Sequence, residues 1–251
     1  MKLYSRPAVL SIAGFDPSAG AGIAADIKTF ESLKTKGLAV ATCITYQHED
    51  QFFGFEPLEN KIIFNQLNPL LQRYQPAWVK IGMTASFEQL DAIVSFLKKH
   101  NENINIIWDP VFRPTFGSDV WPEIKLDLNR LKQFYLITPN LEEVKLLSGE
   151  NGIDGAKLLS QHTRVLLKGG HAEGENKGRD FLVVDGGGKV YPFKPKKIRG
   201  YEKHGTGCVL SSAITAHLAR KFPLIKAVLR SRDYLARFMD TTIDRWGYHK
   251  L

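Results

Sequence analysis

The stretch that decides the fold is AVLSIAGFDPSAGAGIAADIKTF, residues 8–30. It begins with the apolar run AVLSIA (8–13), which is typical of a buried strand. After a loop rich in glycine, apolar residues recur at spacings of four, three and three, on one face of a predicted helix: Ile23, Ile27, Phe30 and Leu33. We expect Lys36 and Gly37 to end this helix, as a cationic last turn and a C-cap. The stretch thus predicts a strand, a polar loop and a helix in succession.

The same alternation continues along the chain. Further strands are predicted at 38–46, 78–83, 105–110, 134–140 and 163–170, and a hairpin at 181–193. Further helices are predicted at 61–74 (broken or kinked near Pro69), 87–100, 141–149, 205–222 and about 224–245. Strands that alternate with helices predict a mostly parallel sheet covered by helices on both faces. With no internal repeat and no flexible linker, residues 1–251 are expected to form a single domain.

Composition excludes several classes of protein. Of 251 residues, 43% are hydrophobic and 24% charged, which is ordinary for a globular chain and excludes collagen-like and disordered proteins. Two cysteines exclude a disulfide-dense scaffold and a four-cysteine zinc site. No apolar run approaches the ~18 residues that span a bilayer, and the N-terminus does not resemble a signal peptide, so we expect no membrane partner and a cytoplasmic location. The net charge of +8 suits an anionic partner but does not identify one.

The strongest motif is HGTGC, residues 204–208, which leads into a predicted helix. Gly205, Thr206 and Gly207 at a helix start allow backbone N–H groups to converge on an anion, and the helix dipole adds to the attraction. Cys208 falls in the first turn, where we expect a lowered pKa and a role as base or nucleophile. A glycine-rich turn with a small buried cysteine fits the same letters. His204 is expected to be structural rather than a ligand.

A second motif is the loop GFDPSAGAG, residues 14–22, with Asp26 one helical turn further on. It is not a Walker A loop, and it lacks the third glycine of the dinucleotide-binding fingerprint. It brings bare backbone close to a ligand or is an ordinary strand-to-helix turn.

Polar residues also follow three later strands. Asp109 begins DPV, Asn140 and Glu143 lie in TPNLEE (138–143), and Lys168 begins KGGH. Oxygen ligands of this kind suit Mg²⁺, usually through water, and a lysine at a strand end can balance phosphate charge. Asn140 and Glu143 equally predict a helix N-cap with a capping box, and the two roles can coexist.

Taken together and in this order, these motifs, with IAGFDPSAGAGIAADIKTF and VKIGM, resemble the hydroxymethylpyrimidine/phosphomethylpyrimidine kinases of thiamin biosynthesis. The resemblance runs from about residue 8 to 220. It implies a ribokinase-like three-layer α/β/α sandwich and a homodimer. It also implies an enzyme that uses ATP and Mg²⁺ to phosphorylate 4-amino-5-hydroxymethyl-2-methylpyrimidine and then its monophosphate.

The resemblance also implies roles for individual residues. Gly205 to Cys208 match the family's anion hole, with Cys208 at the position of the catalytic base. Lys168, Asn140 and Asp109 match positions at the ATP phosphates, and Asn140 with Glu143 matches the magnesium element. The positions that match pyrimidine contacts are Gly14, Ala21, Asp26, Gln47, Met83 and Val111.

This chain departs from the family in three places. His48 stands where Asn is common, Phe112, Arg113 and Pro114 stand where relatives have small residues and Lys or Ser, and 200–203 is not Thr- and Asn-rich. A related alternative is a pyridoxine/pyridoxal kinase of the cysteine type. Those kinases that trap pyridoxal covalently carry a second cysteine in the loop after DPV, and this chain has no cysteine there. A third alternative, a nucleotide-binding regulator or nucleic-acid binder, rests on the net charge of +8 and the basic loop 194–203. It leaves the glycine loops and Cys208 without a purpose, so we expect no nucleic-acid partner.

Overall fold

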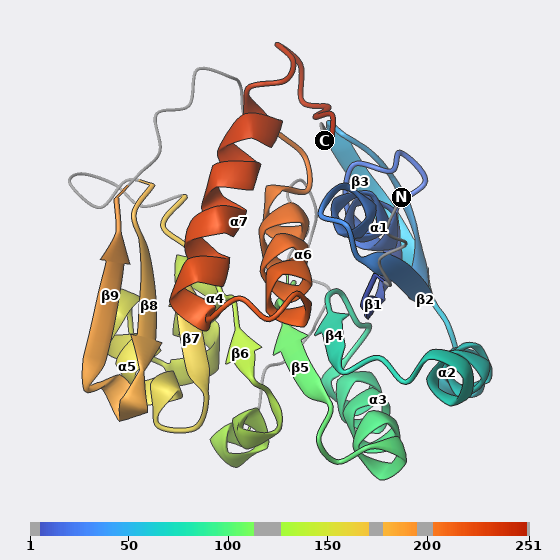
Figure 1. Cartoon of the computed structure of the whole chain (residues 1–251), viewed down its shortest axis with the longest axis horizontal. Coiled ribbons are helices and arrows are strands. Elements are labelled where there is room, and N and C mark those ends of the chain that lie inside the picture. The colour runs from blue at the N-terminus through green and yellow to red at the C-terminus, as the bar shows by residue number, and fades with distance from the viewer. Residues whose placement is uncertain (1–5, 113–126, 171–177, 195–202, 250–251) are drawn as a thin grey trace, which may run out of the picture.

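The computed structural model describes residues 6–112, 127–170, 178–194 and 203–249. Its described strands join one sheet in the order β3-β2-β1-β4-β5-β6-β7-β8-β9 (Figure 1). The strands are β1 (Ala8–Phe15), β2 (Lys36–His48), β3 (Gln51–Pro57), β4 (Trp78–Ile81), β5 (Asn105–Trp108), β6 (Leu136–Ile137), β7 (Arg164–Leu167), β8 (Asp180–Val184) and β9 (Lys189–Phe193). In their order across the sheet, β2, β1, β4, β5, β6 and β7 run parallel to one another. At the two edges, β3 is antiparallel to β2, β8 to β7 and β9 to β8.

Helices cover both faces of this sheet. The α-helices are α1 (Gly22–Ser32), α2 (Asn60–Tyr74), α3 (Phe87–His100), α4 (Leu141–Ser148), α5 (Gly152–Ser160), α6 (Thr206–Ala219) and α7 (Leu224–Met239). Alternate residues of β1 separate the two faces: Leu10 and Ile12 pack with α2 and α3, while Val9 packs with α1 and α6. Figure 1 shows α6 and α7 in front of the sheet and α4 and α5 behind it. The expected three-layer α/β/α sandwich with a mostly parallel sheet is confirmed.

The strand order reverses beside β1, which has β2 on one side and β4 on the other. In open α/β sheets, ligands bind beyond the carboxyl ends of strands at such a reversal. The loops that follow the parallel strands β1, β4, β5, β6 and β7 all lie at the carboxyl ends of these strands. The fold therefore predicts the site at the loops that carry the motifs.

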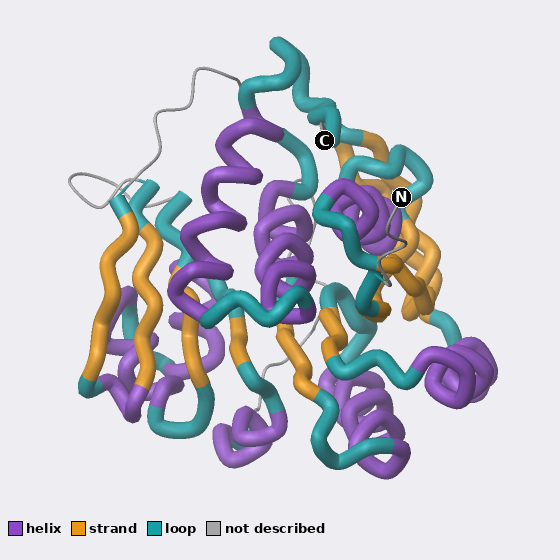
Figure 2. Tube along the Cα trace, viewed as in Figure 1, coloured by secondary structure: helices purple, strands orange, loops and turns teal. Residues whose placement is uncertain are grey.

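Several element boundaries differ from the expected ones (Figure 2). α1 ends at Ser32, so Lys36 and Gly37 belong to β2 rather than to the end of the helix. α7 ends at Met239 rather than near residue 245. α2 is one helix that contains Pro69. β3 and α5 were not predicted from the sequence.

Among the described residues, no helix combines the length and the apolarity that a bilayer crossing requires.

Candidate functional site

The predicted anion loop, Gly205–Cys208, lies at the start of α6. Gly205 is the N-cap and has φ +76°, a left-handed conformation that favours glycine. A Cβ at this position would lie 2.0 Å from the carbonyl oxygen of Gly20, so the anion loop is pressed against the loop between β1 and α1. Gly207 faces the other way, since its Cβ would lie 3.5 Å from Lys168 Nζ. The first N–H groups of a helix have no intrahelical acceptor. The anion loop therefore presents backbone donors next to the partly buried ammonium group of Lys168.

Cys208 lies in the first turn of α6 and is half-buried. Burial raises the pKa of its thiol to about 11, although the charge of Lys80 acts in the opposite direction. The carboxylates of Asp26 and Asp109 add to the increase. The expected lowering of this pKa is therefore wrong for the protein without ligands, because burial and two nearby anions outweigh the helix terminus and the lysine.

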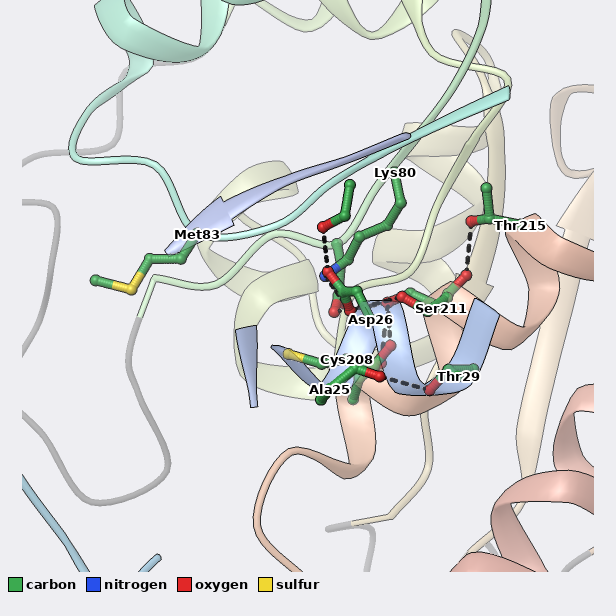
Figure 3. A network of polar contacts seen from close by, with 12 residues as sticks. Ala25, Asp26, Thr29, Lys80, Met83, Cys208, Ser211 and Thr215 are labelled. Atoms are coloured by element: carbon green, nitrogen blue, oxygen red, sulfur yellow. Dashed lines mark hydrogen bonds and ion pairs between the residues drawn. The ribbon is translucent and has the colours of Figure 1, made fainter. Parts of the chain in front are cut away.

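A buried ion pair lies next to Cys208. The ammonium of Lys80, on β4, lies 2.8 and 3.1 Å from the two carboxylate oxygens of Asp26, on α1. Both side chains are completely buried. The hydroxyl groups of Ser11 and Ser212 donate to the same carboxylate at 2.5 and 2.6 Å. Figure 3 shows Lys80 reaching toward Asp26, with Cys208 nearby on α6. The network joins three elements, β1, α1 and α6, to β4.

A second buried carboxylate, Asp109, follows β5. Its Oδ1 accepts from Lys168 Nζ at 2.8 Å and from the Thr138 hydroxyl at 2.9 Å, and its Oδ2 accepts from Ser211 at 3.0 Å. Burial opposes ionisation of both partners. Lys168 nevertheless holds the pKa of Asp109 below its ordinary value, and Asp109 with Glu143 raises the pKa of Lys168. Lys168 is thus a positive charge fixed at the anion loop.

Asn140 and Glu143 form the predicted capping box of α4. Asn140 Oδ1 accepts from the Glu143 N–H at 2.8 Å, and Glu143 Oε2 accepts from the Asn140 N–H at 2.6 Å. Burial raises the pKa of Glu143 to about 7, and its Oε2 lies 3.7 Å from Lys168 Nζ. The carboxylate and amide oxygens gathered here are the ligand types that Mg²⁺ prefers. The donor set fits an ion held through water, although the described residues include no cluster of three or more metal-ligating side chains.

We expect Glu143→Gln to change how stability depends on pH. The pKa of Glu143 is about 7 in the folded protein and 4.5 in its ordinary state, so between these values the folded protein holds a proton that the unfolded chain releases. This group therefore makes the free energy of unfolding fall as pH rises through that interval. Glu143→Gln keeps an acceptor for Asn140 and should flatten the dependence. Urea unfolding at about pH 5 and about pH 7.5 measures this. Glu150→Gln, at an exposed position, is the control, and an unchanged slope in Glu143→Gln would refute the assignment.

The positions matched to the pyrimidine lie around the end of β1. A Cβ at Gly14 would lie 2.9 Å from Cys43 Sγ and 3.6 Å from Met83 Sδ. Gln47, on β2, donates from Nε2 to the Thr45 hydroxyl at 2.8 Å. Gly14, Met83 and the stretch of β2 that carries Gln47 are thus brought together.

The other three of these positions have different surroundings. Ala21 donates its backbone N–H to Asp16, and Val111 follows β5 and packs against the core. Asp26 is fully buried, with its carboxylate already in contact with Lys80, Ser11 and Ser212. Asp26 is therefore positioned to support the site from beneath its surface.

His204 makes a contact that the sequence analysis missed. Its Nε2 lies 2.9 Å from Asp16 Oδ2, and both side chains are buried. Asp16 also accepts from the N–H groups of Gly20 and Ala21 at 3.1 and 2.8 Å. Although burial opposes it, the bond to His204 holds the pKa of Asp16 below its ordinary value. Asp16 and His204 thus fix the loop after β1 to the start of the anion loop.

Other residues of the sequence analysis are not placed. The loop positions 113–117, His171 and the segment 195–202 lie outside the described residues.

Comparison with known proteins gives a consistent result. The family model described as phosphomethylpyrimidine kinase matches residues 16–249. The hydroxymethylpyrimidine/phosphomethylpyrimidine kinase of Aquifex aeolicus is 36% identical over 237 residues, which cover 90% of this chain and 91% of the relative. The crystal structure of a phosphomethylpyrimidine kinase from Clostridium difficile superposes with a TM-score of 0.77 at 36% identity, covering 92% of this chain and 98% of that one.

A pyridoxal kinase is also similar. The structure of the Staphylococcus aureus enzyme in complex with ADP gives a TM-score of 0.79 at 26% identity, covering 98% of this chain and 94% of that one. The family model and the higher identities nevertheless agree on one assignment. The chain belongs to the hydroxymethylpyrimidine/phosphomethylpyrimidine kinase family.

Proposed function

We propose that this protein transfers the γ-phosphoryl group of ATP to 4-amino-5-hydroxymethyl-2-methylpyrimidine and then to the resulting monophosphate, giving the pyrophosphate used in thiamin biosynthesis. The observation that carries the proposal is the juxtaposition of the anion loop, Cys208 and the Lys168–Asp109 pair. Family membership supports the same reaction. We also propose that residues 1–251 act as one domain, that the enzyme is a cytoplasmic homodimer, and that its partners are small molecules.

In this mechanism the acceptor lies between Gly14 and the anion loop. Its ring is expected against Gly14, Ala21, Gln47, Met83 and Val111, with Asp26 behind them. The amide of Gln47 can both donate to a ring nitrogen and accept from an exocyclic amine. This leaves the hydroxymethyl group directed toward Cys208.

In the chemical step the acceptor oxygen forms a bond to the γ-phosphorus while the bond from that phosphorus to the β-bridging oxygen breaks, and ADP leaves. In the first transfer Cys208 takes the proton of the acceptor hydroxyl; in the second the attacking group is an ionised phosphate oxygen, and no hydroxyl proton has to be removed. Backbone N–H groups of the anion loop and the ammonium of Lys168 stabilise charge on the transferring group, since phosphoryl transfer depends mainly on positioning and neutralisation. Mg²⁺, held through water near Asn140 and Glu143, would neutralise charge on the ATP phosphates.

The test is release of ADP from MgATP with three acceptors: hydroxymethylpyrimidine, its monophosphate and pyridoxine. The proposal expects turnover of both pyrimidines. Turnover of pyridoxine alone would instead favour the pyridoxal kinase alternative, which the similarity to the S. aureus pyridoxal kinase structure supports. No turnover with any acceptor would refute both.

We expect Lys168→Met to lower kcat/KM for ATP by roughly 10- to 150-fold, since hydrogen bonds to charged groups contribute about 1.5–3 kcal/mol. The substitution removes a partly buried ammonium that faces Gly207 and Asp109. Initial rates over a range of ATP concentrations measure the effect. Lys132→Met, at an exposed position, is the matched control. An unchanged kcat/KM in Lys168→Met would remove Lys168 from the phosphate site.

A further inference from the structure

The segment that follows α7, residues 241–249, contacts the site although the sequence analysis gave it no function. Figure 1 shows it running from the end of α7 toward β2 and β3. Its described residues form no helix or strand. Its contacts reach three separate parts of the site: the residues just before the anion loop, the loop between β1 and α1, and the turn between β2 and β3.

The first contact involves Lys203, two residues before Gly205. Lys203 is 2% exposed, which is rare for a lysine. Its ammonium donates to the carbonyl oxygen of Thr242 at 2.7 Å and to that of Asp244. The next backbone N–H, that of His204, donates to the carbonyl oxygen of Arg245 at 2.9 Å. Two consecutive residues at the entrance to the anion loop are therefore bound to this segment.

The second contact is made by Trp246. Its indole N–H donates to the carbonyl oxygen of Ser18 at 3.1 Å. The ammonium of Lys28 lies 4.7 Å from the centre of the Trp246 ring and donates to the carbonyl oxygen of Ala19 at 2.9 Å. The loop between β1 and α1 is thus held by a hydrogen bond and a cation–π contact.

The third contact joins Arg245 to Asp50, in the turn between β2 and β3, at 3.7 Å. Beyond it, His249 accepts or donates a hydrogen bond with the Tyr234 hydroxyl at 2.8 Å, which fixes the end of the segment on α7. The segment is therefore fixed at one end by its continuation from α7 and at the other by the bond between His249 and Tyr234. Between these ends it contacts the residues before the anion loop, the loop between β1 and α1, and the turn between β2 and β3.

We propose that Thr242–Trp246 is a strap that holds the anion loop in its catalytic position, and that Lys203 is the positioning residue that joins the loop to the strap. The proposal rests on the proposed kinase function of the anion loop. Gly205 is already in close contact with Gly20, and His204 with Asp16, so we expect the anion loop and the loop between β1 and α1 to shift together if the strap is released. A misplacement of about 1 Å can cost a hundredfold in rate. The ammonium of Lys203 supplies hydrogen-bond donors to the carbonyl oxygens of Thr242 and Asp244, and so joins the strap to the anion loop.

The test compares Lys203→Ala with Lys203→Met. We expect kcat to fall about a hundredfold in both, with a smaller rise in KM for the pyrimidine acceptor, because Ala21 lies in the loop between β1 and α1 while most of the proposed ring contacts lie outside it. n-Propylammonium matches the atoms that Lys203→Ala removes beyond Cβ. It should restore kcat at least tenfold in Lys203→Ala and not in Lys203→Met, whose side chain fills the same space. Lys99→Ala, at an exposed position, is the control for effects of the amine itself.

A readout without catalysis separates this proposal from the proposed function. Cys208 lies in the anion loop that the strap holds, so its alkylation by iodoacetamide, followed by mass spectrometry, should be faster in Lys203→Ala. n-Propylammonium should slow the alkylation again. This result with an inactive wild-type protein would keep the strap and refute the kinase. An unchanged kcat and alkylation rate in Lys203→Ala would overturn the strap. Losses that n-propylammonium does not reverse would overturn the role of Lys203 as a positioning cation.

Discussion

Cys208→Ala should lower kcat with hydroxymethylpyrimidine by about 10²- to 10⁴-fold, the usual contribution of a positioned proton acceptor. The anion loop and Lys168 remain in place, so KM for ATP should change little. Cys208 is half-buried, and the free energy of unfolding should therefore fall by no more than about 1 kcal/mol. Steady-state rates and urea unfolding measure the two effects separately.

The pH dependence sharpens this prediction. The pKa of the Cys208 thiol is about 11, so at neutral pH most of the enzyme carries the protonated form. Each unit of pH below that pKa lowers the thiolate fraction tenfold. We therefore expect kcat/KM of the wild-type enzyme to rise with pH through the neutral and mildly alkaline range, and the rise to be lost in Cys208→Ala. A wild-type profile that is flat, or a mutant with near-wild-type kcat, would remove Cys208 from the role of base.

Lys80→Met should lower the free energy of unfolding by about 3–5 kcal/mol, since removing one partner of a buried ion pair leaves the other charge uncompensated. The carboxylate of Asp26 would keep its hydrogen bonds from Ser11 and Ser212. It would lose the ammonium of Lys80, which lies 2.8 Å away and balances its charge. Urea unfolding measures the loss. Activity should fall as well, because Lys80 is the cation whose charge favours the Cys208 thiolate.

The chain provides a matched control for this substitution. Lys189 and Asp185 are also 2.8 Å apart, but their side chains are 62% and 60% exposed. Lys189→Met should cost no more than about 1 kcal/mol, because surface ion pairs contribute little. Adding Asp26→Asn to Lys80→Met should recover part of the loss. Equal effects of Lys80→Met and Lys189→Met would mean that the buried pair is not a determinant of stability.

Much of the fold could be predicted from local pattern. The alternation of apolar runs and helical faces gave the order of most elements, because period and turn chemistry are local properties. The end of α1 was misplaced. Lys34 adopts a left-handed φ of 62° and closes the helix, a role that the sequence analysis gave to Gly37. A Cβ at Gly37 would lie 2.9 Å from Ile27 Cδ1, so this glycine serves the packing of β2 against α1 instead.

The site was predictable in its parts and not in its connections. The motifs at the strand ends pointed to Gly205–Cys208 and Lys168, which the structure places side by side, while their role toward a phosphate stays a prediction. The alternative interpretation of Asn140 and Glu143 as a helix cap is confirmed. The buried pairs were not predictable, because their members are 54, 59 and 188 residues apart: Asp26–Lys80, Asp109–Lys168 and Asp16–His204. One signal for the first was available, since Lys80 is a lone charge in the apolar strand VKI. The sign of the Cys208 pKa shift depends on these distant groups.

The proposed two-step phosphorylation is tested most directly by phosphorus NMR of one reaction that contains the protein, MgATP and hydroxymethylpyrimidine. We expect the pyrimidine monophosphate to appear first and then to be converted to the pyrophosphate in the same tube, with one ADP formed in each step. The absence of any phosphorylated pyrimidine, while pyridoxine in a parallel tube is phosphorylated, would contradict it.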